Sequence, residues 1–157
     1  MTTRLGLTLT AILGLASLMA PAPAAAQDAG VTGAAEAAFP NGAAFNGVSL
    51  KGLTLGQGMY IAQDGSATGQ FQAVLLGTSP LGTPQNVTVE GEVGGGSVAA
   101  DGSATFSGTA TVDMGDGTLA LPGVPFAVTV SAGSLGLILN AVALPTATVT
   151  AGSITIK

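Results

Sequence analysis

The 157-residue sequence contains no cysteine, no histidine and no tryptophan. Without cysteine the chain has no disulfide and no thiolate nucleophile, and without cysteine and histidine it lacks the usual ligands of zinc. The absence of histidine removes the side chain most often used for general acid–base catalysis. We therefore predict that the protein is not an enzyme, and we identify no catalytic residue and no cofactor-binding residue in it.

Charged side chains are also scarce. Only 7% of the residues are charged and 47% are hydrophobic, whereas globular proteins carry about a quarter of charged residues, so a disordered polar chain is excluded. Three basic residues stand against eight acidic ones, and such a chain repels nucleic acids and anionic lipids. We expect no nucleic-acid partner, whereas a cationic partner or a divalent cation is electrostatically compatible.

Residues 1–26 have the three parts of a secretory signal peptide. Arg4 supplies the positive start, residues 5–19 form an apolar stretch, and three alanines at 24–26 offer a cleavage site before Gln27. The apolar stretch is shorter than the roughly 20 residues of a membrane span. We predict a cleaved signal, a bacterial protein that is periplasmic or secreted, and no transmembrane span in the mature chain, whose net charge is −6 from two lysines and eight carboxylates.

The mature chain changes character near residue 47. Residues 27–46 are rich in alanine and glycine without a sustained period, so we predict a flexible leader with at most a weak helical turn at residues 34–38. Residues 47–157 consist of short Val, Leu, Ile, Thr and Phe runs separated by Gly, Asp-Gly and Pro. This pattern is typical of an all-β chain, and we predict one β-domain.

Two segments show the strand pattern best. In residues 87–93 the valines alternate with Thr88, Glu90 and Glu92, and residues 104–114 alternate without a break between apolar or small residues and Thr, Ser or Asp. Such alternation indicates strands with one buried and one solvated face. Phe71, Phe106 and Phe126 fall on buried faces in this scheme. The other predicted strands are residues 48–55, 59–63, 69–77, 97–100, 118–121, 125–131, 135–143 and 147–156, the last with a bulge near Gly152.

About 8–10 short antiparallel strands in some 110 residues favour a two-sheet β-sandwich. A small closed up-and-down β-barrel is the alternative. The block DGSAT occurs twice, at residues 64–68 and 101–105, and both copies predict a strand, an Asp-Gly turn and a strand. Two hairpins that use the same turn residues explain the repeat more simply than a duplication does.

Four aspartates in predicted turns are candidate calcium ligands, because Ca²⁺ prefers carboxylate and carbonyl oxygens. Their spacing matches no known calcium loop, and Asp before Gly is also ordinary hairpin chemistry. A structural calcium ion is therefore the only metal or cofactor that the sequence suggests. The four candidates are Asp64, Asp101, Asp113 and Asp116.

Glu90 and Glu92 form the best enzyme-like pair, since side chains two residues apart on a strand lie about 6.5–7 Å apart on one face. A solvated strand face is the favoured explanation, because nothing near the pair would keep either carboxyl protonated and no aromatic wall for a sugar is evident. Our leading hypothesis is an exported, non-enzymatic β-domain that acts by binding or by forming extracellular or envelope structure. The alternatives are a binder of small apolar ligands with a cavity between the sheets or inside a barrel, lined by residues 135–144, a matrix protein that self-associates through strand edges, and an acidic-residue hydrolase.

Overall fold

The computed structural model describes residues 28–157, so the predicted signal peptide at residues 1–26 lies outside the described residues. All regular structure from residue 28 onward is β-strand. In this described part we find no helix of the length and apolarity needed to cross a membrane. The strands are β1 (Ala29–Ala38), β2 (Ala44–Phe45), β3 (Val48–Ile61), β4 (Ser66–Thr78), β5 (Val87–Val98), β6 (Ala104–Asp113), β7 (Leu121–Val130), β8 (Ser134–Leu139), β9 (Val142–Ala143) and β10 (Ala147–Ile156).

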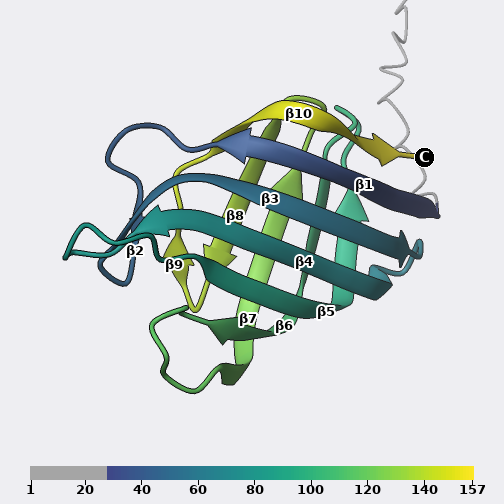
Figure 1. Ribbon diagram of the computed structural model, residues 1–157. Helices are drawn as coiled ribbons and strands as arrows, with labels where there is room; N and C mark the ends of the chain where they lie inside the picture. The colour runs from purple at the N-terminus through teal and green to yellow at the C-terminus, as the bar shows by residue number, and fades with distance from the viewer. Residues whose placement is uncertain (1–27) are drawn as a thin grey trace, which may run out of the picture.

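The strands belong to one large antiparallel sheet in the order β1-β10-β8-β7-β6-β5-β4-β3-β2, and β1 also pairs with β3. The pairings thus return to the strand from which they start, and they form a ring of hydrogen bonds that leaves out only the two-residue strands β2 and β9. In Figure 1, β1, β3 and β4 run across the front, and β6, β7 and β8 run behind them at a steep angle. The sequence-based prediction of an all-β antiparallel fold is confirmed.

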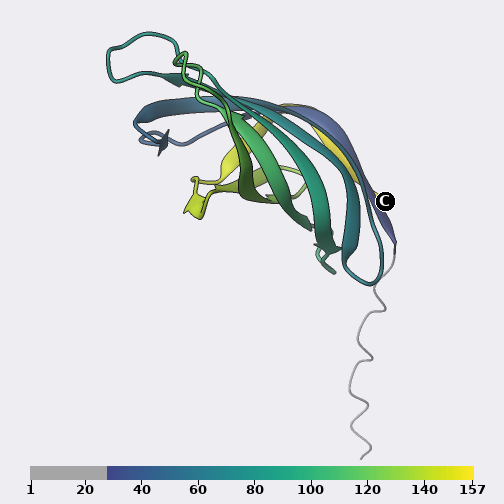
Figure 2. The ribbon, with the colours of Figure 1, turned by 90° about the horizontal axis from the view of Figure 1, so that it is seen from below.

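The longest strands carry bulges. β3, β4 and β5 have 14, 13 and 12 residues, and the strand register shifts at Leu50/Gly52, at Ser66/Gly69 and at Val93/Gly95. A bulge bends a strand and increases its twist, and the sheet is strongly curved in Figure 2. The two strands predicted at residues 48–55 and 59–63 are one strand, because the intervening glycines keep an extended backbone.

The prediction of a flexible leader over residues 27–46 is wrong. Residues 29–38 form β1, which pairs with β3 over ten residues and with β10 over eight. The side chains here are small because the neighbouring strand is close: a Cβ atom on Gly33 would lie 2.4 Å from the carbonyl oxygen of Ser153. Val31, Ala35 and Ala37 are buried, so a period of two exists, but alanine and glycine hide it. The β-domain begins at Ala29.

One apolar core fills the ring, and it includes residues from every strand of the ring. Phe71 is a fully buried residue of this core. The centroid of its ring lies 5.8 Å from that of Phe106 and 5.6 Å from that of Phe126. The predicted core positions of these three rings are confirmed, as is the alternation along β6. Within residues 28–157 no polar or charged residue falls in the fully buried class. Apolar burial is therefore the main source of stability.

Candidate ligand-binding site

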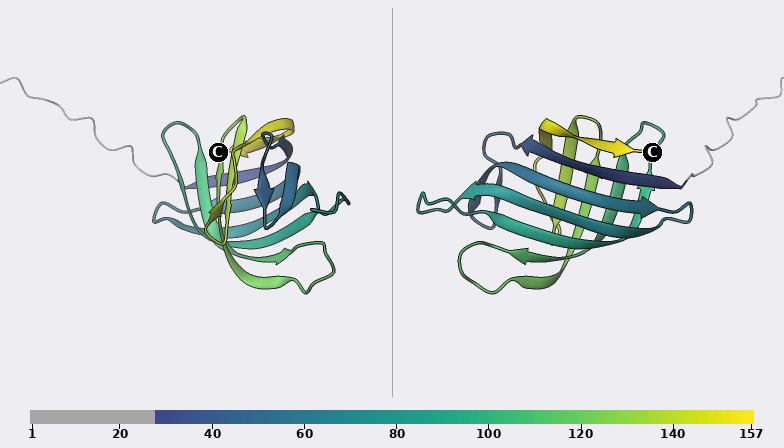
Figure 3. Two further views of the ribbon diagram at one scale, coloured as in Figure 1. Left: turned by 90° about the vertical axis from the view of Figure 1, so that its left-hand side faces the viewer. Right: turned by 45° about the vertical axis from the view of Figure 1, so that its right-hand side comes forward.

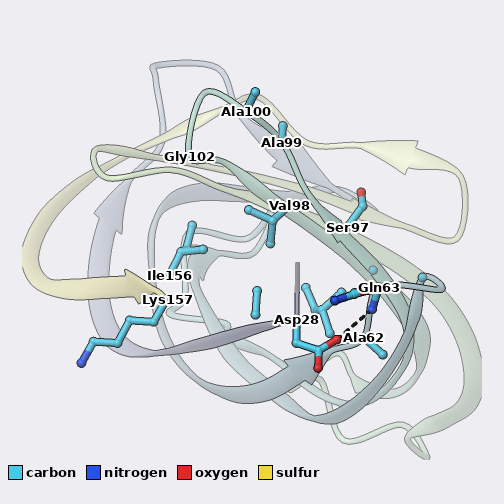
Figure 4. A pocket seen from close by; sticks show the side chains of 14 residues that line it. Asp28, Ala62, Gln63, Ser97, Val98, Ala99, Ala100, Gly102, Ile156 and Lys157 are labelled. Atoms are coloured by element: carbon cyan, nitrogen blue, oxygen red, sulfur yellow. Dashed lines mark hydrogen bonds between the residues drawn. The ribbon is translucent and has the colours of Figure 1, made fainter. Parts of the chain in front are cut away.

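A hollow with a volume of about 800 Å³ lies at one end of the ring. The start of β1, the β3–β4 turn, the β5–β6 turn and the end of β10 surround it (Figure 4). Its lining residues are Asp28, Ala29, Ile61, Ala62, Gln63, Gly65, Gly96, Ser97, Val98, Ala99, Ala100, Gly102, Ile156 and Lys157.

The inner wall of this hollow is apolar. Ile61 lines the hollow and is buried, whereas Val98 is 37% exposed. In Figure 4, Val98 and Ile156 point toward the middle of the hollow, while the ammonium group of Lys157 points away from it. An apolar wall with a few polar groups at the mouth is the usual make-up of a small-molecule site.

Asp28 fixes the polar part of the rim. Its carboxylate accepts a 2.5 Å hydrogen bond from the Tyr60 hydroxyl and a 3.1 Å hydrogen bond from the Gln63 backbone N–H. The hydrogen bond to the Asp28 carboxylate raises the pKa of Tyr60 above its ordinary value, because losing the phenolic proton would place two negative charges side by side. The bonds tie the start of β1 to the end of β3, so the rim is held at this point.

A gap in strand pairing explains why the ring is open here. β10 pairs with β8 only at Ala147 and Thr148, and the Val149 N–H donates to the Gly133 carbonyl. From Ala151 to Ile156, β10 is paired with β1 alone among the described strands. The chain ends beside the start of β1, as the right-hand view of Figure 3 shows. The register of β10 shifts at Thr150, two residues before Gly152, where we predicted a bulge.

Two of the predicted calcium ligands, Asp64 and Asp101, lie in the turns beside the hollow. Each carboxylate accepts hydrogen bonds from the backbone N–H and the hydroxyl of the serine two residues later, Ser66 or Ser103, at 2.9 and 2.6 Å in both turns. These bonds lower the pKa of both aspartates, and the bond from the serine hydroxyl has the larger effect. The repeated DGSAT block therefore builds the same turn twice at the same end of the ring.

The other two predicted ligands, Asp113 and Asp116, lie between β6 and β7. Asp116 accepts hydrogen bonds from the N–H and hydroxyl of Thr118, which lower its pKa, and Asp113 accepts one from the Gly115 N–H. Across residues 28–157 no three His, Cys, Asp or Glu side chains gather into a group that could hold a metal ion. The aspartates act as turn formers in this geometry, and the sequence-based hypothesis of a calcium site stays untested.

Glu90 and Glu92 lie on the outer face of β5, as their alternation predicts. Glu90 is opposite Gln72 and Thr111, and Glu92 is opposite Gln70 and Thr109. This polar face lines a shallow hollow of about 330 Å³. Its described lining is mainly polar and includes no lysine or arginine.

The leucines at residues 135–144 do not line the candidate site. Leu135, Leu137, Leu139 and Leu144 are buried in the core, and none of them borders the hollow. Sequence reasoning missed the true lining because Val98 and Ile156 look like ordinary ends of strands. The two DGSAT blocks mark turns that border the hollow, but the sequence pattern does not indicate that these turns lie at the same end of the sheet. No protein-family model, no curated protein sequence and no solved structure matches the chain.

Proposed function

We propose that this protein is an exported, non-enzymatic binding domain that takes up a small, mainly apolar molecule at the open end of the strand ring. The observation that carries the proposal is the hollow of about 800 Å³ with an apolar wall at Ile61, Val98 and Ile156. Small-molecule sites have volumes of about 300–1,000 Å³ and this kind of wall. The predicted signal peptide supports a location outside the cytoplasm.

The strand pairing supports a small barrel over the two-sheet sandwich, because the pairings run from β1 around to β1 again. Barrels of about eight strands have an interior that side chains fill or that holds one small ligand. Here an apolar core lies inside the ring, and the hollow lies at the end where β10 has lost its second neighbour. The ligand would enter at that end.

The single tyrosine provides the test. The chain has one Tyr and no Trp, and Tyr60 is hydrogen-bonded to Asp28, which lines the hollow. Titration of the mature protein with decanol should therefore change the tyrosine fluorescence in a saturable way. Val98→Asp should abolish this fluorescence change, because an apolar ligand in the hollow would remove water from the new carboxylate without replacing its hydrogen bonds. Val142→Asp is the matched control, since Val142 is 43% exposed and lies in β9, away from the hollow. Equal responses of both variants would contradict the proposed site.

Self-assembly is a second candidate function, and the free edge of β10 favours it. Gly30 and Lys157 exchange two backbone hydrogen bonds, at 2.8 and 3.0 Å. Since bonded and non-bonded pairs alternate in an antiparallel ladder, the peptide groups of Gly152, Ile154 and Ile156 point away from β1. Such a row of unpaired groups is a template for another strand, and no charged side chain occurs between Ala147 and Ile156 to protect it.

Sedimentation of the mature protein over a range of concentrations tests this second function. Assembly through β10 predicts oligomers that grow with protein concentration. Ser153→Lys or Thr155→Lys should dissociate these oligomers, because a charge beside a strand edge opposes pairing. Both side chains are exposed on the outer face. The equivalent control is Thr109→Lys, on the outer face of β6, which is paired on both sides. A monomer at every concentration would remove this candidate.

A further inference from the structure

One polar side chain points into the apolar interior of the ring. Gln57 lies on β3, where Leu53, Leu55, Met59 and Ile61 alternate with it and are buried. Its strand neighbours are Gly33 on β1 and Phe71 on β4, and Phe71 is a central core residue. The parity of the strand therefore places the amide of Gln57 on the inner face.

Neither end of this amide has a protein partner. The Nε2 and Oε1 atoms of Gln57 are both buried, and neither makes a hydrogen bond to any part of the described chain. These are the only buried side-chain nitrogen or oxygen atoms of residues 28–157 in that condition. A buried polar group without a partner reduces the free energy of unfolding, and native proteins keep few such groups. An apolar side chain of similar size, such as methionine, would suit the ligand-free core better.

Gln57 lies below the candidate site on the same strand face. Ile61 lines the hollow, and four residues of extended chain place Gln57 about 13 Å from it along β3. Met59 is the one inward side chain of β3 between them. Methionine is unbranched and changes rotamer easily, so its movement can extend the hollow toward the Gln57 amide.

We propose that Gln57 is the specificity-determining residue of the ligand site, and that it binds an uncharged group with both a hydrogen-bond donor and an acceptor at the inner end of an elongated apolar ligand. The inference rests on the proposed function. A primary amide or a protonated carboxylic acid fits, because each matches the paired donor and acceptor of a glutamine amide. A charged group does not fit, since the fully buried residues of the described chain are all uncharged and apolar.

Two amides of equal chain length test this assignment. Decanamide keeps the donor and acceptor, whereas N,N-dimethyldecanamide keeps the acceptor and loses both donors. The wild-type protein should bind decanamide at least about tenfold more tightly, as one or two neutral hydrogen bonds in a buried site imply. In Gln57→Met the two affinities should become equal, and the Tm of the ligand-free protein should rise by a few degrees. Gln70→Met, an exposed outer-face position on β4, should change neither result.

The outcomes separate this inference from the function on which it rests. If both amides bind wild-type protein equally and Val98→Asp still abolishes binding, the ligand site stands and the role of Gln57 is overturned. If neither amide nor decanol binds, the proposed function itself fails. A lower Tm in ligand-free Gln57→Met also overturns the inference, because the amide would then stabilise the folded chain by itself.

Discussion

Tyr60 donates a 2.5 Å hydrogen bond from its hydroxyl to the carboxylate of Asp28, which precedes it by 32 residues. Asp28 comes just before β1, and Tyr60 lies next to the end of β3, so the bond joins two neighbouring strands at the rim of the ring. The tyrosine side chain is 49% exposed. The contact is therefore a surface link that solvent can reach and that spectroscopy can follow.

We predict that Asp28→Ala lowers the pKa of Tyr60 toward the ordinary tyrosine value of about 10. The carboxylate hydrogen bond and its negative charge both favour the protonated phenol. Because Tyr60 is the only tyrosine and tryptophan is absent, the phenolate absorbance at high pH reports this one group. Unchanged titration curves in wild type and variant would show that the link does not form in solution.

The turn aspartates should make stability depend on acid pH. The pKa values of Asp64, Asp101 and Asp116 are lowered by hydrogen bonds from the side-chain hydroxyl and backbone N–H of Ser66, Ser103 and Thr118. A lowered folded-state pKa gives a stabilising contribution that is present above the unfolded value of about 4 and is lost as pH falls through the folded value.

The measurement is the Tm of wild type and Asp101→Ala as a function of pH. We expect a higher Tm for wild type near neutral pH, and a difference that narrows steadily below about pH 4 as the carboxyl is protonated. Ser103→Ala keeps the carboxylate but removes its closest donor, so it should reproduce part of the difference. A gap of constant size down to about pH 2 would exclude this explanation.

Gly91→Ala should destabilise the core. A Cβ atom at Gly91 would lie 2.6 and 2.9 Å from two atoms of the Phe126 ring, which stacks on Phe71. Forcing a methyl group into such a contact costs about 1–3 kcal/mol of unfolding free energy. Gly94→Ala on the same strand is the control, since no atom lies within 4 Å of its Cβ position. Urea unfolding compares the two, and equal midpoints would show that Phe126 moves aside without cost.

Calcium should leave the melting temperature unchanged. An ion that binds only the folded state raises its stability by mass action, but the carboxylates of Asp64, Asp101, Asp113 and Asp116 each accept hydrogen bonds within their own turns. Thermal melts with millimolar Ca²⁺ and with a chelator test this directly. A clear rise in Tm with Ca²⁺, absent in Asp64→Asn or Asp116→Asn, would establish the metal site that the Asp-Gly pattern suggested.

The sequence predicts the strands best where large and polar side chains alternate. β6 is recognisable because Phe106 and Val112 stand out among threonines, and its alternation is preserved in the structure. β1 was predicted wrongly, since alanine and glycine give no contrast between the two faces. Only the pairing with β3 and β10 reveals the strand, and a pairing with distant segments leaves no mark in local composition.

Turn residues were informative within their own hairpins and uninformative about the site. Asp64 and Asp101 predicted tight turns, and Gly65 and Gly102 have the positive φ values of 85° and 81° that such turns require. The pattern could not show that the two turns lie at the same end of the ring. Gln57 was equally invisible, because a single glutamine between glycines gives no sign of which way it faces.

The short pairing between β8 and β10 also affects how easily the ring opens locally. It consists of two residue pairs, whereas β7 and β8 share five and β3 and β4 share twelve. Local opening has a free energy that grows with the number of pairs broken, and regions of low local stability exchange their amide hydrogens first. The amides of Ala147 and Val149, which face β8, should accordingly exchange well before those of β4, and the ring would widen at its entrance while the aromatic core around Phe71 stays folded.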